Sequence, residues 1–176
     1  MDNHILIHAD SGICDYYTPA NILIAARYVI GGGFDLDPAS CAEANKTVNA
    51  AAYFTAEDDG LSLNWYGDVF LNHPFSRIGN PLWINKLVAE YESGRVKSAV
   101  CICFAAVNAQ WFAPLLNYPQ FFPAKRINYI RPGGGVARGV TKDSVITYLP
   151  RNFVYGESVD RLQTFFNAHG IAGKAK

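Results

Sequence analysis

The sequence lacks an excess of charge of either sign. Its 176 residues carry 15 basic and 15 acidic side chains, so the formal net charge is zero. No general attraction to polyanions follows from this balance, and a nucleic-acid partner would need a local basic face. The sequence also has no apolar run long enough to cross a membrane and no basic-then-apolar leader at its start. We therefore expect a cytoplasmic protein without a membrane partner.

The four cysteines, Cys14, Cys41, Cys101 and Cys103, lack the spacing of metal ligands. Cys101 and Cys103 stand two residues apart in an apolar run, where both would face the same side of a strand. Core thiols in a reducing compartment are the expectation, and no metal site is predicted. A phosphate-gripping glycine signature is also missing after the first predicted strand, which argues against a nucleotide anchored by its phosphates.

What is present is an alternation of strand and helix patterns. Thr18 as a cap and Pro19 at the first helical position begin a predicted helix over residues 20–30. Further helices are predicted over residues 42–46, 81–93, 108–117 and 161–176. Strands are predicted over residues 34–37, 51–55, 68–72, 98–106, 120–123, 126–130 and 144–150. This order indicates one α/β domain over residues 1–176, with a mostly parallel sheet and an antiparallel edge hairpin.

Ligands of open parallel sheets collect at the carboxyl ends of the strands. The segments that follow the predicted strands here are residues 37–40, 57–59, 72–75 and 105–108. Carboxylates in the first two segments could accept hydrogen bonds from a ribose or from the amine of a nucleoside cofactor. The acidic turn at residues 57–59 could instead be a solvated loop, because Asp and Gly favour turns.

Several motifs occur together in a fixed order: "DYYTP" at residues 15–19, "DLDPAS" at 35–40, "YFTAEDDGL" at 53–61 and "GDVFLNHPFS" at 67–76. Trp65, Trp83 and the pair Trp111-Phe112 accompany them. The ordered set resembles the phage-type, Dam-like DNA adenine-N6 methyltransferases over roughly residues 15–150. The resemblance implies a Rossmann-like fold, S-adenosylmethionine as methyl donor, DNA as substrate, and a phage or prophage gene expressed in a bacterial host.

The resemblance also implies a donor pocket. Tyr17, Thr18 and Pro19 look like the segment that borders the methionine part of the donor. The segment Asp37, Pro38 and Ala39 looks like a degenerate first donor-binding loop. Asp58 and Asp59 look like the acidic residues that approach the ribose or adenine, and the sequence does not distinguish between them.

The resemblance places the catalytic motif at Asn72, His73, Pro74 and Phe75. The adenine amine is a poor nucleophile, and an enzyme activates it by accepting both of its hydrogens. The Asn72 side-chain carbonyl and the His73 backbone carbonyl are the expected acceptors, with Pro74 stiffening the turn and Phe75 stacking on the flipped base. His73 departs from the family, which usually has proline there. The alternative is an ordinary turn at a strand end.

Basic residues are the candidates for contacts with DNA phosphates: Arg77, Arg126, Arg131, Arg138 and Lys142. The last four, together with Arg151, are expected to cluster around the glycine-rich loop over residues 133–139. A scattered solvated face is the alternative. Because no separate target-recognition domain is predicted, we expect short or relaxed specificity, and a homodimer would add contacts from a second subunit. The same turn would also suit cytosine N4 or an RNA adenine. A catalytically impaired module that binds donor or nucleic acid is a further alternative.

Overall fold

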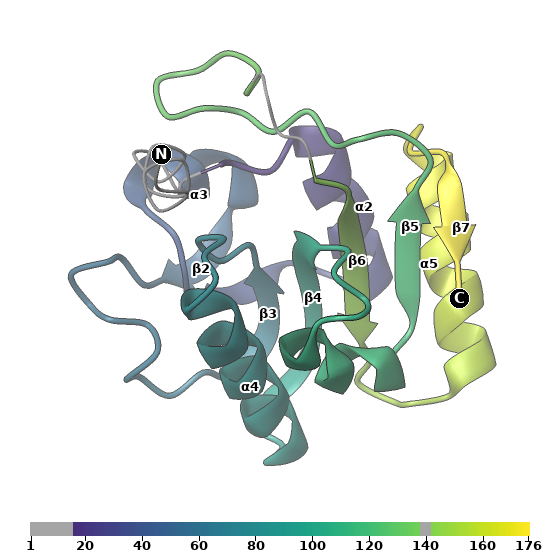
Figure 1. Ribbon diagram of the computed structural model, residues 1–176, viewed down its shortest axis with the longest axis horizontal. Coiled ribbons are helices and arrows are strands. Elements are labelled where there is room, and N and C mark those ends of the chain that lie inside the picture. The colour runs from purple at the N-terminus through teal and green to yellow at the C-terminus, as the bar shows by residue number, and fades with distance from the viewer. Residues whose placement is uncertain (1–15, 138–141) are drawn as a thin grey trace, which may run out of the picture.

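The computed structural model describes residues 16–137 and 142–176. A central sheet with helices against it forms the structure (Figure 1). The helices are α2 (Ala20–Ile30), α3 (Ala42–Val48), α4 (Gly79–Glu92), the 3₁₀ helix η1 (Gln110–Asn117) and α5 (Tyr155–Ala168). The strands are β1 (Phe34–Asp37), β2 (Ala50–Tyr53), β3 (Gly67–Leu71), β4 (Val96–Phe104), β5 (Gln120–Pro123), β6 (Ser144–Leu149) and β7 (Gly173–Ala175).

Helix α2 has the bounds expected from the sequence but a different cap. Pro19 is its N-cap residue, in an extended conformation, and no side chain of the described residues caps the first turn. The prediction of Thr18 as the cap was therefore wrong, and its hydroxyl bonds elsewhere. The helix ends at Gly31, whose φ of 93° lets its N–H bond the Arg27 carbonyl.

The seven strands lie in the order β2-β1-β3-β4-β6-β5-β7. The pairs β1–β2, β1–β3 and β3–β4 are parallel. The pairs β4–β6, β5–β6 and β5–β7 are antiparallel, so the sheet is mixed rather than mostly parallel with one edge hairpin. Part of the difference from the predicted sheet comes from β7. The helix predicted over residues 161–176 ends at Ala168, the chain turns at Gly170, and the last residues add an antiparallel strand beside β5.

The strand predicted over residues 126–130 does not form. Tyr129 is buried, while Ile130 makes only isolated bridges with Tyr17 and Val136. The antiparallel neighbour of β6 on this side is β5 instead. Residues 124–137, after β5, instead form a loop that meets Tyr17 through Ile130.

Both faces of the sheet are covered. Strand β4 sends Val100 and Ile102 into the core under α2 and α5, and Ala99, Cys101 and Cys103 into the core under α4 and η1. A strand buried on both faces was predicted from this continuous apolar run and is confirmed. The two thiols share one side, also as predicted. Within the described ranges no helix has the length and apolar character needed to span a membrane.

Candidate active site

A cavity of about 470 Å³ opens at the carboxyl ends of β1, β2 and β3. This volume lies in the range of small-molecule sites. The residues predicted for the site that line it are Tyr17, Thr18, Asp37, Pro38, Ala39, Asp59, Asn72 and Pro74. The predicted residues Pro19, Asp58, His73 and Phe75 do not line it. The structure thus brings four segments, distant in sequence, to one place at the strand ends.

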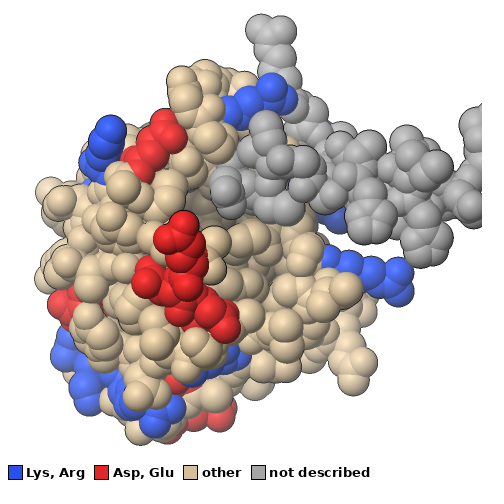
Figure 2. All heavy atoms as spheres, turned by 90° about the vertical axis from the view of Figure 1, so that its left-hand side faces the viewer, with Lys and Arg blue, Asp and Glu red and all other residues tan. Residues whose placement is uncertain are grey.

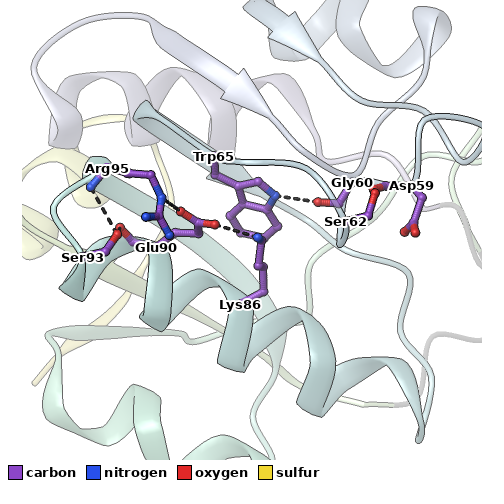
Figure 3. A network of polar contacts seen from close by, with 8 residues as sticks. All are labelled: Asp59, Gly60, Ser62, Trp65, Lys86, Glu90, Ser93 and Arg95. Atoms are coloured by element: carbon purple, nitrogen blue, oxygen red, sulfur yellow. Dashed lines mark hydrogen bonds and ion pairs between the residues drawn. The ribbon is translucent and has the colours of Figure 1, made fainter.

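Two loops close one wall of the cavity by direct contact. A Cβ atom on Gly60 would stand 2.0 Å from the Pro38 carbonyl oxygen, so only glycine fits there. The indole N–H of the buried Trp65 donates to the Gly60 carbonyl at 2.7 Å. The Asp59 carbonyl accepts from the hydroxyl of Ser62 at 2.8 Å (Figure 3). These bonds fix the acidic turn to the residues that follow it, and the close approach of Gly60 to Pro38 sets it against the loop that follows β1.

Helix α4 packs beside this wall and is tied to the sheet by a buried acid. The side chain of Glu90 is 2% exposed and pairs with Lys86 at 2.6 Å and with Arg95 (Figure 3). Burial alone would raise the pKa of Glu90, but the bonds from Arg95 and Lys86 outweigh it and hold that pKa below its ordinary value. Because Arg95 directly precedes β4, the ion pairs join the end of α4 to the sheet.

The two neighbouring aspartates of the acidic turn have different surroundings. The carboxylate of Asp58 accepts from the backbone N–H of Thr55 at 2.8 Å and from its hydroxyl at 2.7 Å. These bonds lower the pKa of Asp58, and they close the turn. Asp59 lines the cavity and has a left-handed φ of 52°. The geometry therefore makes Asp59 available to a ligand and occupies Asp58 in the turn.

Asp37 is the buried acid of the cavity. It ends β1 and is 3% exposed, with the Ala39 N–H donating to it at 3.3 Å. Burial raises the pKa of its carboxyl to about 7. A cationic group that entered the cavity would compensate this burial and favour the carboxylate.

Asn72 follows β3 and points its side-chain amide across the cavity wall. Its Nδ2 donates to the Tyr16 carbonyl at 2.6 Å and to the Thr18 hydroxyl at 3.0 Å. Both N–H groups are thus used within the protein. Within residues 16–137 and 142–176 no hydrogen bond reaches its Oδ1, which remains an acceptor for a ligand.

His73 turns away from the cavity into an aromatic row. Its ring stacks on Trp83 with centroids 6.2 Å apart and planes at 9°, and it meets Phe75 edge-on at 5.3 Å. Burial lowers the pKa of the imidazole to about 4, against a raising effect of the bond between Nδ1 and the Pro74 carbonyl. Phe75 in turn packs on Phe104, with centroids 4.3 Å apart. The side chain of His73 thus supports the turn from behind.

The glycine-rich loop is bonded to the mouth of the cavity. Glu43 of α3 accepts from the Gly133 N–H at 2.9 Å and from the Tyr17 hydroxyl at 3.2 Å. Tyr17 and Ile130 exchange backbone hydrogen bonds of 2.8 and 2.9 Å. Burial is the main factor that raises the pKa of the Tyr17 phenol, which therefore stays protonated as a donor. The loop lies close to α3 in the ribbon view as well (Figure 1).

The basic residues predicted for DNA contact divide between two ends of the sheet. Arg126 pairs with Asp143 at 3.0 Å, and the Lys142 ammonium lies 5.0 Å from the centroid of the Phe104 ring. Arg151 binds both carboxylate oxygens of Asp68 at 2.9 Å, beyond the opposite end of β6.

The expected grouping of Arg151 with the loop was therefore wrong. Arg77 is exposed directly after the predicted catalytic turn at residues 72–75. Arg131 begins the glycine turn with an N–H bond to the Gly135 carbonyl, and Arg138 lies outside the described residues. Figure 2 shows acidic side chains near the middle of one face and basic ones along its edges.

The cavity is also lined by residues outside the predicted donor and catalytic segments. They are Tyr16, Cys41, Ala44, Thr55, Ala56, Gly60, Phe70 and Trp83, while Ser40 and Glu57 belong to the predicted strand-end segments 37–40 and 57–59. Cys41 departs from the expected core thiol, because it caps α3 and lies 3.4 Å from the Tyr17 hydroxyl. The position of Trp83 within the ordered motifs was a usable signal for its role.

A family model described as DNA N-6-adenine-methyltransferase (Dam) matches residues 11–157. A search of the curated proteins gave no match. Among the described residues, no group of three or more His, Cys, Asp or Glu side chains could hold a metal ion.

Proposed function

The chain belongs to the DNA N-6-adenine-methyltransferase (Dam) family, and we propose that it methylates adenine N6 in DNA with S-adenosylmethionine as donor. Family membership implies the reaction on DNA adenine. The donor, the roles of individual residues and a Rossmann-like reading of the mixed sheet are parts of the proposal. The observation that carries it is that Asn72 of the catalytic turn and the buried acid Asp37 line one cavity.

The chemistry of the cavity suits S-adenosylmethionine. Bound there, the donor would supply a methyl group activated by its sulfonium charge. Asp37 would accept from its ammonium group and Asp59 from its ribose, while the apolar lining, including Trp83, would hold the adenine. Pro38 and Ala39 line the cavity next to Asp37. A phosphate-binding loop is not required by such a ligand.

The acceptor turn would activate the target amine. Asn72 Oδ1 would accept one amine hydrogen, and the His73 backbone carbonyl would accept the other. Accepting both hydrogens localises the nitrogen lone pair for attack on the methyl group. Pro74 restricts the turn that carries the second acceptor. This role does not use the His73 ring, which is consistent with its burial against Trp83.

Phe75 would meet the target base after it leaves the duplex stack. Its ring is partly buried and supported by Phe104 and Tyr129, so the face offered to a base has a rigid backing. Stacking on an aromatic ring contributes on the order of 1–3 kcal/mol per base. Short or relaxed sequence specificity belongs to the proposal, because the basic residues near the site lie on loops and phosphate contacts carry no sequence information.

The test is methylation of defined DNA with labelled donor, followed by mass analysis of the nucleosides. We expect N6-methyladenine, and a loss of at least about 100-fold in rate for Asn72→Ala. Asn117→Ala is the matched control, since Asn117 is exposed at the end of η1. An unchanged rate for Asn72→Ala would refute the catalytic assignment. A labelled methyl group on cytosine N4, or labelling of RNA but not of DNA, would show that the substrate is a different nucleobase amine.

A further inference from the structure

The hydroxyl of Thr18 is buried in contact with the catalytic amide rather than at a helix cap. Thr18 is 2% exposed, and its Oγ1 lies 3.0 Å from Asn72 Nδ2. The same nitrogen lies 2.6 Å from the Tyr16 carbonyl oxygen. The carbonyl of Tyr16 can only accept, so the nitrogen of the Asn72 amide, and not its oxygen, faces this pair.

Two acceptors on one nitrogen fix the rotation of the amide about its last side-chain bond. Each of the two N–H groups has its own partner, so neither is left to compete for a ligand's acceptor. The oxygen is then held toward the cavity that Asn72 lines. Such positioning matters because a displacement of about 1 Å at a reacting centre can lower a rate about 100-fold.

We propose that Thr18 is a positioning residue, which orients the Asn72 amide so that Oδ1 receives the target amine. This role rests on the proposed function. It replaces the expected contact between Thr18 and the methyl donor with a contact that orients the side chain of Asn72. Thr18 acts before the base enters, since the bond exists within the protein itself.

Substitution of Thr18 separates this role from a donor contact. Thr18→Val keeps the branched shape but loses the acceptor, and we expect kcat to fall about 10- to 100-fold with an unchanged Kd for S-adenosylmethionine by calorimetry. Thr18→Ser keeps the acceptor and should restore kcat to within a few-fold of the wild type. A weaker donor Kd with unchanged kcat at saturating donor would overturn the inference, as would a wild-type kcat in Thr18→Val.

A second measurement does not depend on activity. In protein labelled with ¹⁵N at asparagine, the side-chain amide signals of Asn72, assigned by their loss in Asn72→Ala, should exchange slowly with water. Exchange should become faster in Thr18→Val and stay slow in Thr18→Ser, whereas equal exchange in all three proteins would overturn the inference. If Thr18→Val does not fold, Thr18→Cys, with a weak sulfur acceptor, takes its place. A wild type that forms no N6-methyladenine would refute the proposed function, while the amide exchange would still decide the role of Thr18.

Discussion

Gly60 lies so close to Pro38 that the two loops around the cavity touch through their backbones. The Pro38 carbonyl oxygen would stand 2.0 Å from a Cβ on Gly60, and its carbonyl carbon 3.2 Å. Backbone atoms on both sides leave no flexible side chain to yield. The distance between the acidic turn and the loop after β1 is thus set by the absence of one methyl group.

Gly60→Ala should separate these loops. We expect a lower melting temperature, a loss of roughly 1–3 kcal/mol in the free energy of unfolding, and weaker binding of S-adenosylmethionine in calorimetry. Gly32→Ala is the control, because a Cβ on Gly32 meets no atom of the described part of the chain within 4 Å. Equal stability and donor affinity in the two variants would contradict the contact.

Donor binding should depend on pH through Asp37. Its carboxyl has a pKa of about 7, so below this pH it is largely protonated in the free protein. Binding of the donor ammonium would favour the carboxylate and release the proton. The affinity should therefore rise up to about tenfold per pH unit as the pH approaches 7, and level off above it. Calorimetry between pH 5.5 and 8.5 measures this affinity. Asp37→Asn should bind the donor weakly, with an affinity that does not change with pH. A pH dependence that persists in this variant would show that another group causes it.

Acid should destabilise the protein through His73. The folded-state pKa of about 4 lies below the ordinary value of 6.5, so the unfolded chain takes up a proton first. This contribution to stability is present above pH 6.5 and is lost as the pH falls toward 4, by roughly 3 kcal/mol in total. Denaturant titrations of the wild type and His73→Phe measure the difference.

Asp37 acts in the opposite sense over the same range. Its raised pKa means that the folded protein keeps a proton that the unfolded chain releases, so stability falls as the pH rises from about 4 to 7. The contribution of His73 is therefore the difference in unfolding free energy between the wild type and His73→Phe at each pH. The pH dependence of the wild type alone contains both effects. A pH-independent difference would contradict a buried neutral imidazole.

DNA affinity should depend on Lys142 more than on a lysine at the other end of the sheet. Lys142 lies beside Phe104, which contacts Phe75 of the proposed catalytic turn. Lys97 is the matched control, at the start of β4 with its ammonium bonded to the Gly94 carbonyl. Lys142→Ala should reduce the dependence of log K on log salt by about one. Identical slopes for the two variants in a fluorescence anisotropy titration would remove Lys142 from the DNA-binding surface.

Local patterns account for much of the fold. The apolar spacing and the glycine stop predicted α2 over the residues it occupies, and the continuous apolar run predicted β4 as a strand buried on both faces. These features depend on neighbours three or four residues away, or on alternation along one strand. The end of the chain was predicted wrongly, because β7 pairs with β5, whose edge no local pattern reveals.

The candidate site also has features that local sequence patterns predicted and features that they did not. The sequence by itself determined which polar segments follow the strands, because strand ends and turn residues are local signals. Only the tertiary structure decided that Asp59 and not Asp58 lines the cavity and that Arg151 pairs with Asp68 at the far end. It also decided that the Thr18 hydroxyl binds Asn72, 54 residues away, instead of capping α2. A side chain's partner is chosen among all groups that packing brings within about 3 Å, and that choice is not written in the spacing of the chain.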